Sequence, residues 1–218
     1  MSITITGSQD LRRTTSLPSA YTNFTVTAWV KLTNANTRNC VCELRGAGLN
    51  EALCFKKNGS NLPVLGVLDA TGVVDVATQA SANTVGDWYF VGWTNNGTGA
   101  NTYKTYVGGV TGAISSASGT RIAVGAPSRI TMGFDAGSEF LDGAIAAAKM
   151  WEATLTASQI DKERYSQLAD LRTGLHGEWP MFSVTDLSSR SAPVLTWTKT
   201  GSPTSTGQPP VRYSRRAP

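Results

Sequence analysis

Apolar and polar residues alternate along most of this 218-residue chain. In Phe24–Leu32 every second residue from Phe24 to Val30 is apolar, the spacing at which the side chains of a β-strand share one face. Runs of this kind, bounded by Gly, Asn, Pro or Ser, predict further strands at Ser2–Thr6, Asn39–Arg45, Ala52–Lys56, Pro63–Leu68, Val73–Ala77, Trp88–Thr94, Thr102–Val107, Arg121–Val124, Ile130–Phe134, Ala144–Trp151, Leu175–Pro180 and Val194–Thr198. The pattern therefore predicts an all-β protein.

One helix is predicted after most of these strands. Thr156 can cap its first turn, and Gln159 stands three residues later, the spacing of a capping box. Apolar residues then recur loosely on one side, and Gly174 follows the segment. We therefore expect a single short helix from Ala157 to about Leu171.

The length of the chain suits one large all-β domain. We assign residues 1–211 to this domain and treat 176–211 as its closing segment, because about 40 residues with two strands cannot bury a core of their own. A jelly roll often pairs its two chain ends, which gives this segment a place in the sandwich. The stretch Gly201–Pro210 is expected to be irregular, and residues 212–218 form a basic C-terminal tail.

Three phrases carry a resemblance to a known family. They are Phe24–Lys31, Gly86–Trp93 with the hairpin Lys104–Val110, and Phe140–Ile145 running on to Trp151. Together they resemble laminin-G-like, concanavalin-A-like domains, over most of residues 2–165. The resemblance implies a two-sheet antiparallel jelly-roll sandwich with Trp29 packed between the sheets. Trp88 is likewise expected in the core.

The chain departs from the family pattern at two places. Gly108 stands where the family prefers an aspartate, and Ala146–Ala148 stand where it usually has an Asp-Glu pair after the isoleucine. The loss of both acids argues against an activity that depends on them. The small side chains suit either close packing against a neighbouring strand or subunit, or a strand covered by the following helix.

The residues needed for glycan hydrolysis are not grouped in the sequence. Hydrolases with this sandwich use two glutamates on one strand, whereas the glutamates here are all separated, and no Gly-x-Ser-x-Gly motif is present. The single histidine, His176, has no nucleophile beside it and is expected to be solvated or hydrogen-bonded. We therefore predict that the protein is not an enzyme, with a degenerate glycan hydrolase as the weakest alternative.

Calcium and sugar are the ligands that the resemblance suggests. Laminin-G-like domains often hold one calcium ion at a loop rim, and Asp135 with Glu139 is the best-placed pair, ahead of the hairpin acids Asp69 and Asp75. Acids in loops are also common turn formers. The sugar candidates are Trp93, Tyr103 and the Asn95–Asn101 loop. No other cofactor is expected.

The formal net charge of +4 gathers partly at the C-terminus, where Arg212, Arg215 and Arg216 make the last seven residues basic. This tail either docks on an acidic partner surface or is simply frayed. The sequence lacks a basic stripe interleaved with aromatics and an apolar run of about 20 residues, so neither nucleic acid nor membrane is expected as a partner.

Cysteine usage and the N-terminus bear on where the protein is made. Cys40 and Cys42 share one face of a predicted strand, and Cys54 lies in the next apolar run, where it can lie across from them. An odd number of cysteines without a signal peptide predicts synthesis in a reducing cytoplasm and no disulfide.

A sandwich typical of extracellular surfaces, made without an export signal, indicates a virion protein released by lysis. The segment from Trp179 to Val211 resembles the closing segment of laminin-G-like proteins of phages and prophages. The leading interpretation is a phage capsid decoration protein that binds the major capsid protein and copies of itself, as a homotrimer. The alternative is a carbohydrate-binding, lectin-like module of a host-recognition fibre.

Overall fold

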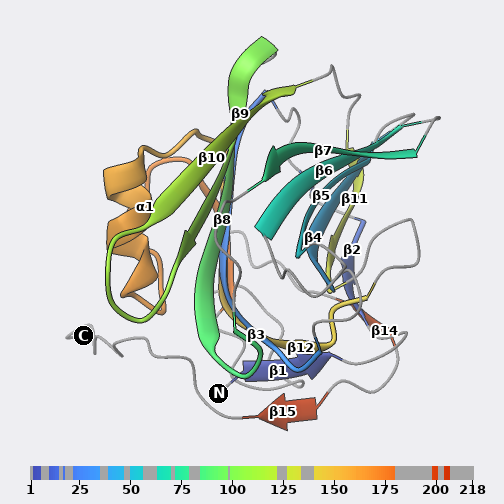
Figure 1. Cartoon of the computed structure of the whole chain (residues 1–218), viewed down its shortest axis with the longest axis vertical. Coiled ribbons are helices and arrows are strands. Elements are labelled where there is room, and N and C mark those ends of the chain that lie inside the picture. The colour runs from blue at the N-terminus through green and yellow to red at the C-terminus, as the bar shows by residue number, and fades with distance from the viewer. Residues whose placement is uncertain are drawn as a thin grey trace.

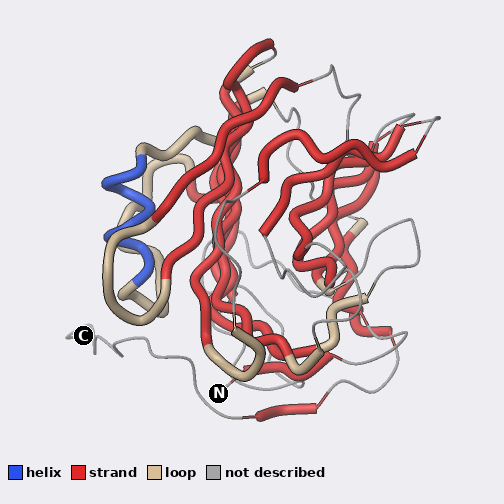
Figure 2. Tube along the Cα trace, viewed as in Figure 1, coloured by secondary structure: helices blue, strands red, loops and turns tan. Residues whose placement is uncertain are grey.

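The computed structural model describes residues 2–5, 10–14, 17, 22–34, 39–46, 50–55, 63–69, 72–78, 84–97, 99–121, 127–133, 140–179, 198–200 and 204–206. Within these residues the chain forms two antiparallel sheets that face each other, and one short helix lies on the outer side of the larger sheet (Figures 1 and 2). The predicted all-β, two-sheet jelly-roll sandwich with one short helix is therefore confirmed.

The larger sheet has eight strands in the order β10-β9-β8-β3-β12-β1-β15, with β13 also paired to β12. Its strands are β1 (Ser2–Ile5), β3 (Asn23–Leu32), β8 (Trp88–Asn96), β9 (Gly99–Gly108), β10 (Ser115–Arg121), β12 (Gly143–Trp151), β13 (Leu175–Trp179) and β15 (Thr204–Thr206). The three phrases that resemble the family fall mainly on β3, β8, β9 and β12.

The smaller sheet has seven strands in the order β14-β2-β11-β4-β5-β6-β7. Its strands are β2 (Asp10–Arg13), β4 (Asn39–Gly46), β5 (Asn50–Phe55), β6 (Pro63–Asp69), β7 (Gly72–Thr78), β11 (Pro127–Met132) and β14 (Thr198–Thr200). The predicted hairpins β4–β5 and β6–β7 are both present.

Three strands were missed or misplaced by the sequence pattern. β10 lies at Ser115–Arg121, and its small polar residues give no apolar alternation because it is a sheet edge; of the predicted strand Arg121–Val124, all but Arg121 lies outside the described residues. β2 is short and basic and was not predicted. β15 lies inside Gly201–Pro210, which was expected to be irregular, and it pairs with β1. With β14 paired to β2, the closing segment adds an edge strand to each sheet.

The space between the sheets holds the larger of two apolar clusters. Phe24 and Val26 of β3 are buried there together with Trp93 of β8, and Phe24 meets Trp93 edge-to-face with ring centroids 4.8 Å apart. The smaller sheet contributes Leu44 and Ile130 among others. The alternation seen in Phe24–Leu32 thus marks the side of β3 that faces the opposite sheet.

Trp29 lies on the other side of β3. It is buried, as predicted, but it packs in a second cluster on the outer face of the larger sheet, with Phe90, Ala146 and Ile160. The expectation that Trp29 sits between the sheets is therefore wrong. Trp88 is only partly buried and packs at the margin of this outer cluster, so its assignment to the core was also wrong.

The helix α1 (Ala157–Arg164) begins as predicted and ends earlier than expected. Thr156 and Gln159 form the capping box, with the Gln159 amide donating to Thr156 Oγ1 at 3.3 Å. The amides of Tyr165 and Ser166 still donate to the carbonyls of Lys162 and Glu163, but further amides find other partners. Those of Asp170 and Leu171 donate to the Glu163 carboxylate, at 3.2 and 2.7 Å. Continuing to Leu171 as a helix would cost these contacts.

Three side chains of the larger sheet hold α1 and the turns that follow it. Trp29 Nε1 donates to the carbonyl of Arg164 at 2.9 Å, and Trp151 Nε1 donates to that of Leu171 at 2.8 Å. Lys149 Nζ donates to the carbonyl of Glu163 at 2.8 Å. The donors to Glu163 and Arg164 bond carbonyl groups of the last helical turn, whereas Trp151 bonds a carbonyl of the segment after the helix.

The alanine run on β12 lies beneath this segment. Ala146 and Ala147 are buried in the outer cluster with Ile160 of α1. Ala147 has φ +46° at an irregularity in the β12–β3 pairing, between Ala146 and Lys149. Of the two interpretations of the small side chains, the structure supports a strand covered by the following helix.

The cysteines lie on neighbouring strands of the smaller sheet. Cys40 of β4 stands opposite Cys54 of β5 in the antiparallel register, and Cys40 and Cys42 are both buried. The position of Cys54 across from the pair agrees with the expectation. The absence of a disulfide stays a prediction.

Candidate functional site

The strands β8 and β9 present opposite chemistry on their two faces. Val91 and Trp93 of β8, with Tyr103 of β9, point between the sheets. Their sequence neighbours Thr94 and Lys104 line the outer face instead. This follows from the two-residue period of a strand.

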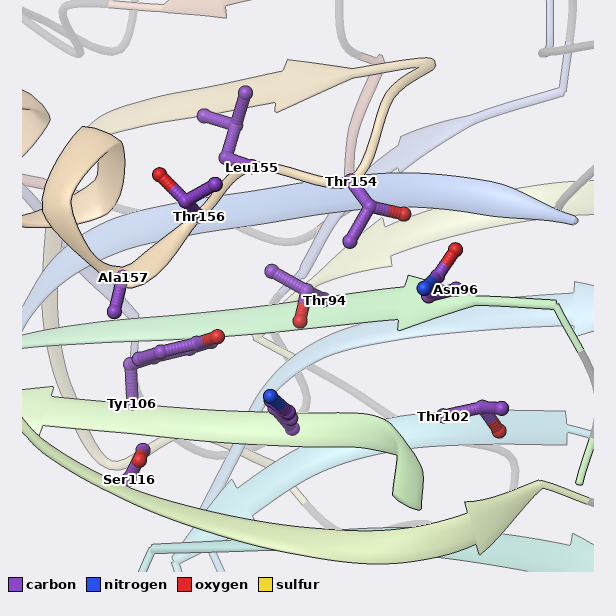
Figure 3. Close-up of a pocket in the computed structure, with 10 residues that line it drawn as sticks. Thr94, Asn96, Thr102, Tyr106, Ser116, Thr154, Leu155, Thr156 and Ala157 are labelled. Atoms are coloured by element: carbon purple, nitrogen blue, oxygen red, sulfur yellow. The ribbon is translucent and has the colours of Figure 1, made fainter. Parts of the chain in front are cut away.

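A groove of about 460 Å³ lies on this outer face, between β8, β9 and β10 and the loop that leads into α1 (Figure 3). Its lining residues are Thr94, Asn96, Thr102, Lys104, Tyr106, Ser116, Thr154, Leu155, Thr156 and Ala157. The lining is dominated by hydroxyl groups, with one amide and one ammonium group.

Cross-strand register places the groove side chains in rows. Lys104 stands opposite Thr94 on β8 and opposite Ser118 on β10. Tyr106 stands opposite Ser116 in the next row. Directly opposed residues of antiparallel strands have Cβ atoms about 4.5–5.5 Å apart, so each row brings neighbouring polar groups within reach of one ligand.

The wall formed by Thr154–Ala157 is fixed to the sheet by hydrogen bonds. Thr25 Oγ1 on β3 donates to the carbonyl of Ala153 at 2.7 Å and accepts from the amide of Leu155 at 2.9 Å. Thr154 Oγ1 donates to the carbonyl of Asn95 on β8. The width of the groove is therefore set by contacts to the two strands beneath it.

Tyr106 is one of the buried residues that line the groove, with Thr94 and Leu155. Its side chain is buried in the outer cluster and also lines the groove. Burial raises the pKa of the phenol above its ordinary value, and a hydrogen bond with Thr94 opposes that shift. The phenol therefore stays protonated at neutral pH, where it is a hydrogen-bonding group rather than a base.

The aromatic residues proposed from the sequence as a sugar platform do not form one. Trp93 and Tyr103 are both fully buried between the sheets, with ring centroids 6.3 Å apart. Asn95 is buried too, and its Nδ2 donates to the carbonyl of Thr22 at 2.9 Å. Of the predicted Asn95–Asn101 loop, Asn96 does reach the groove.

Two buried glutamates, one on α1 and one on β13, bond groups around the end of the helix. Glu163 pairs with Lys149 at 2.9 Å, and both side chains are 1% exposed. Glu178 on β13 accepts from the amide of Ala169 at 2.5 Å and pairs with Arg172. Burial lowers the pKa of Lys149, and the Glu163 carboxylate opposes this shift. Because these groups are buried and bonded to protein, they act as an anchor for the helix segment.

His176 is hydrogen-bonded, as expected: its Nδ1 lies 2.7 Å from Glu152 Oε1 at the protein surface.

The side chains of the remaining predicted site residues are not described. Asp135 and Glu139 lie outside the described residues, as do Arg212, Arg215 and Arg216. The backbones of Asp69 and Asp75 belong to β6 and β7. In the part of the chain that the structure describes, no three His, Cys, Asp or Glu residues gather in a way that could hold a metal ion.

The chain belongs to the concanavalin A-like lectin/glucanases superfamily, whose family model matches residues 6–161. No curated protein sequence matches the chain significantly. Among the described residues, no helix is both long enough and apolar enough to cross a membrane.

Solved structures with the same fold come from several kinds of protein. Tailspike protein 2 of the Escherichia coli O157:H7 bacteriophage CAB120 is 14% identical with a TM-score of 0.60, over 82% of this chain and 26% of the tailspike. A heptameric SAP-like pentraxin from Limulus polyphemus is 18% identical with a TM-score of 0.52, over 73% of this chain and 79% of the pentraxin.

A third structure is domain 4 of AbnA, a GH43 extracellular arabinanase from Geobacillus stearothermophilus, in complex with arabinotriose. It is 20% identical with a TM-score of 0.51, over 65% of this chain and 66% of that domain. This chain thus spans about a quarter of the tailspike and about two thirds of the arabinanase domain. At these identities the likeness concerns the fold alone.

Proposed function

We propose that this chain is a non-catalytic binding module that holds a glycan in the groove on the outer face of the larger sheet. The observation that carries the proposal is the gathering of hydroxyl and amide groups around one concavity of about 460 Å³. Hydroxyls both donate and accept hydrogen bonds, as the hydroxyls of a sugar require, and the volume lies in the usual range of ligand sites. Asn96, Lys104 and Ser116 are exposed there, which leaves their polar groups open to a ligand.

The lining of the groove supports binding without hydrolysis. Hydrolysis of a glycosidic bond normally needs two carboxyl groups on either side of the bond, about 5–5.5 Å apart in retaining enzymes. No carboxylate lines the groove among the described residues. Glu163 and Glu178 are buried and bonded to protein groups, so neither lines the groove. The related arabinanase domain carries arabinotriose, which supports a saccharide as the ligand.

Filling the groove is expected to weaken glycan binding strongly. Ser116 is exposed on the edge strand β10, so Ser116→Trp places an indole in the groove without disturbing the space between the sheets. Wild type should bind at least one glycan class on a printed array, and the variant should bind it at least about tenfold more weakly by calorimetry. Thr111→Trp, on the exposed β9–β10 turn, is the matched control and should bind as wild type does.

Two results would contradict this assignment. Binding that survives Ser116→Trp would place the site elsewhere on the molecule. A wild-type protein that binds no glycan on the array would remove the proposal altogether.

A second candidate function is a structural role on a phage particle, as a capsid decoration protein. The likeness to a phage tailspike supports a virion setting, and so does the resemblance of the closing segment to phage proteins. In this role the protein is made in the host cytoplasm, assembles as a homotrimer, and binds the major capsid protein by surface contacts alone. Many copies per particle, counted by quantitative mass spectrometry, would favour decoration, and few copies would favour a host-recognition fibre.

The basic tail supplies a separate test of the decoration role. Removing residues 212–218 deletes Arg212, Arg215 and Arg216, and is expected to lower occupancy on particles and to reduce the sensitivity of attachment to salt. Occupancy is measured by sedimentation of particles with added protein at low and high salt. The melting temperature of the truncated chain should equal that of the full chain. Full occupancy at every salt concentration would show that the tail makes no contact with the particle.

A further inference from the structure

We infer that the groove is selective for acidic glycans, saccharides that carry a carboxylate, and that Lys104 is the residue that selects them. The inference rests on the proposed glycan-binding function and adds the chemical class of the ligand. It begins from the charge of the groove. Among the described residues that line it, Lys104 is the one charged side chain.

The surroundings of Lys104 leave its charge uncompensated. Its partners across the strands, Thr94 and Ser118, are neutral hydroxyl residues. Within the described chain no carboxylate lines the groove. An ammonium group with no acid beside it gives the groove a positive potential, which favours an anion over a neutral ligand of the same shape.

The row that contains Lys104 also fits the shape of a carboxylate. One oxygen can accept from the ammonium group, while the other accepts from a flanking hydroxyl, with both donors presented on the same face of the sheet. The neutral groups of Asn96 and Ser116 remain for the ring hydroxyls. A sugar acid therefore uses both kinds of lining group, whereas a neutral sugar leaves the ammonium group without a charged partner.

The wall of the groove adds to the same potential. Thr156, the cap of α1, lines the groove, and the first turn of the helix contains no acidic residue. The positive end of the helix dipole thus acts in the same direction as Lys104 and is not neutralised by a side chain of that turn.

The test compares one saccharide with and without its charge. Trigalacturonic acid and its carboxyl-reduced, neutral form are titrated into the full-length protein by calorimetry. We expect the acid to bind about fivefold to tenfold more tightly, and this preference to disappear in Lys104→Gln. Lys162→Gln, at an exposed lysine of α1 outside the groove, is the matched control and should keep the preference.

Salt provides a second readout that a structural role of Lys104 would not move. Raising the ionic strength from about 0.01 M to about 1 M shortens the Debye length from about 30 Å to about 3 Å. The affinity of wild type for the acid should fall over this range, while that of Lys104→Gln should change little. The melting temperature of Lys104→Gln should match wild type, because the side chain is exposed.

Each of the remaining outcomes would overturn a stated part of the inference. Equal affinity of wild type for the two trisaccharides would overturn the acidic preference and leave glycan binding in place. Binding of only neutral glycans on the array would do the same. An acidic preference that persists in Lys104→Gln would assign it to another group and overturn the role of Lys104. No binding to any glycan would overturn the proposed function together with the inference.

Discussion

Replacing Trp29 with alanine is expected to lower the free energy of unfolding by about 3–5 kcal/mol, the usual cost of removing a fully buried large aromatic side chain. Trp29 is 1% exposed and packs against Phe90 with ring centroids 5.8 Å apart. Its loss also removes the donor that satisfies the carbonyl of Arg164. The change is measured by equilibrium unfolding in urea.

Two companion variants separate packing from hydrogen bonding. Trp29→Phe keeps most of the buried ring but cannot donate to Arg164, so it should cost clearly less than Trp29→Ala. Trp88→Ala removes a tryptophan that is only partly buried at the margin of the same cluster, and it should also cost less. An unchanged unfolding midpoint for Trp29→Ala would mean that the helix segment does not pack on this face.

Replacing Lys149 with methionine is expected to destabilise the protein by about 3–5 kcal/mol, because it leaves a buried carboxylate without its counter-charge. Lys149 and Glu163 are both 1% exposed and lie 2.9 Å apart. Lys149 Nζ also donates to the carbonyl of Ser166 at 2.5 Å, so the substitution frees acceptors on both sides of the helix end. Thermal and chemical unfolding should report the same loss.

The double variant Lys149→Met with Glu163→Gln tests the cause. Removing the second charge should recover a large part of the lost stability, since the remaining amide oxygen can still accept from Asp170 or Leu171. Lys162→Met, at an exposed lysine on the same helix, should stay within about 0.5 kcal/mol of wild type. A loss below about 1 kcal/mol for Lys149→Met would show that the buried pair does not anchor the helix.

The strands that carry strong alternation could be predicted from the sequence, and those at the edges could not. β3 and β8 pair as central strands with apolar residues at regular spacing, so their limits lie close to the predicted ones. β10 lacks that signal because, as an edge strand with much of its surface exposed, it needs few apolar residues. The start of α1 could be predicted because a capping box depends only on neighbouring residues.

The residue at which the helix ends, and the face of β3 on which Trp29 packs, both depend on residues far away in sequence. The last turn of α1 is bonded by Trp29 and Lys149, and the segment after it by Trp151; these side chains come from β3 and β12. Both faces of β3 are buried, so alternation alone cannot tell which face meets the opposite sheet. Period-two reasoning therefore found the buried strand, and the family resemblance placed its tryptophan on the wrong side.

The groove was only partly visible in the sequence. Thr94, Thr102 and Lys104 alternate with buried aromatic residues, which is a usable signal for a polar outer face. The aromatic residues Trp93 and Tyr103, from which a sugar site was predicted, belong instead to the space between the sheets. The wall at Thr154–Ala157 could not be predicted, because its position is set by hydrogen bonds to Thr25 on a distant strand.

Because the two faces of β8 and β9 differ in chemistry, alternate residues of these strands serve two separate purposes. Odd-numbered positions such as Trp93 and Tyr103 specify the packing of the sandwich, and even-numbered positions such as Thr94 and Lys104 specify the groove. Substitutions at the groove positions leave the side chains between the sheets unchanged. Natural variation can thus change what the surface binds while the packing of the sandwich stays the same.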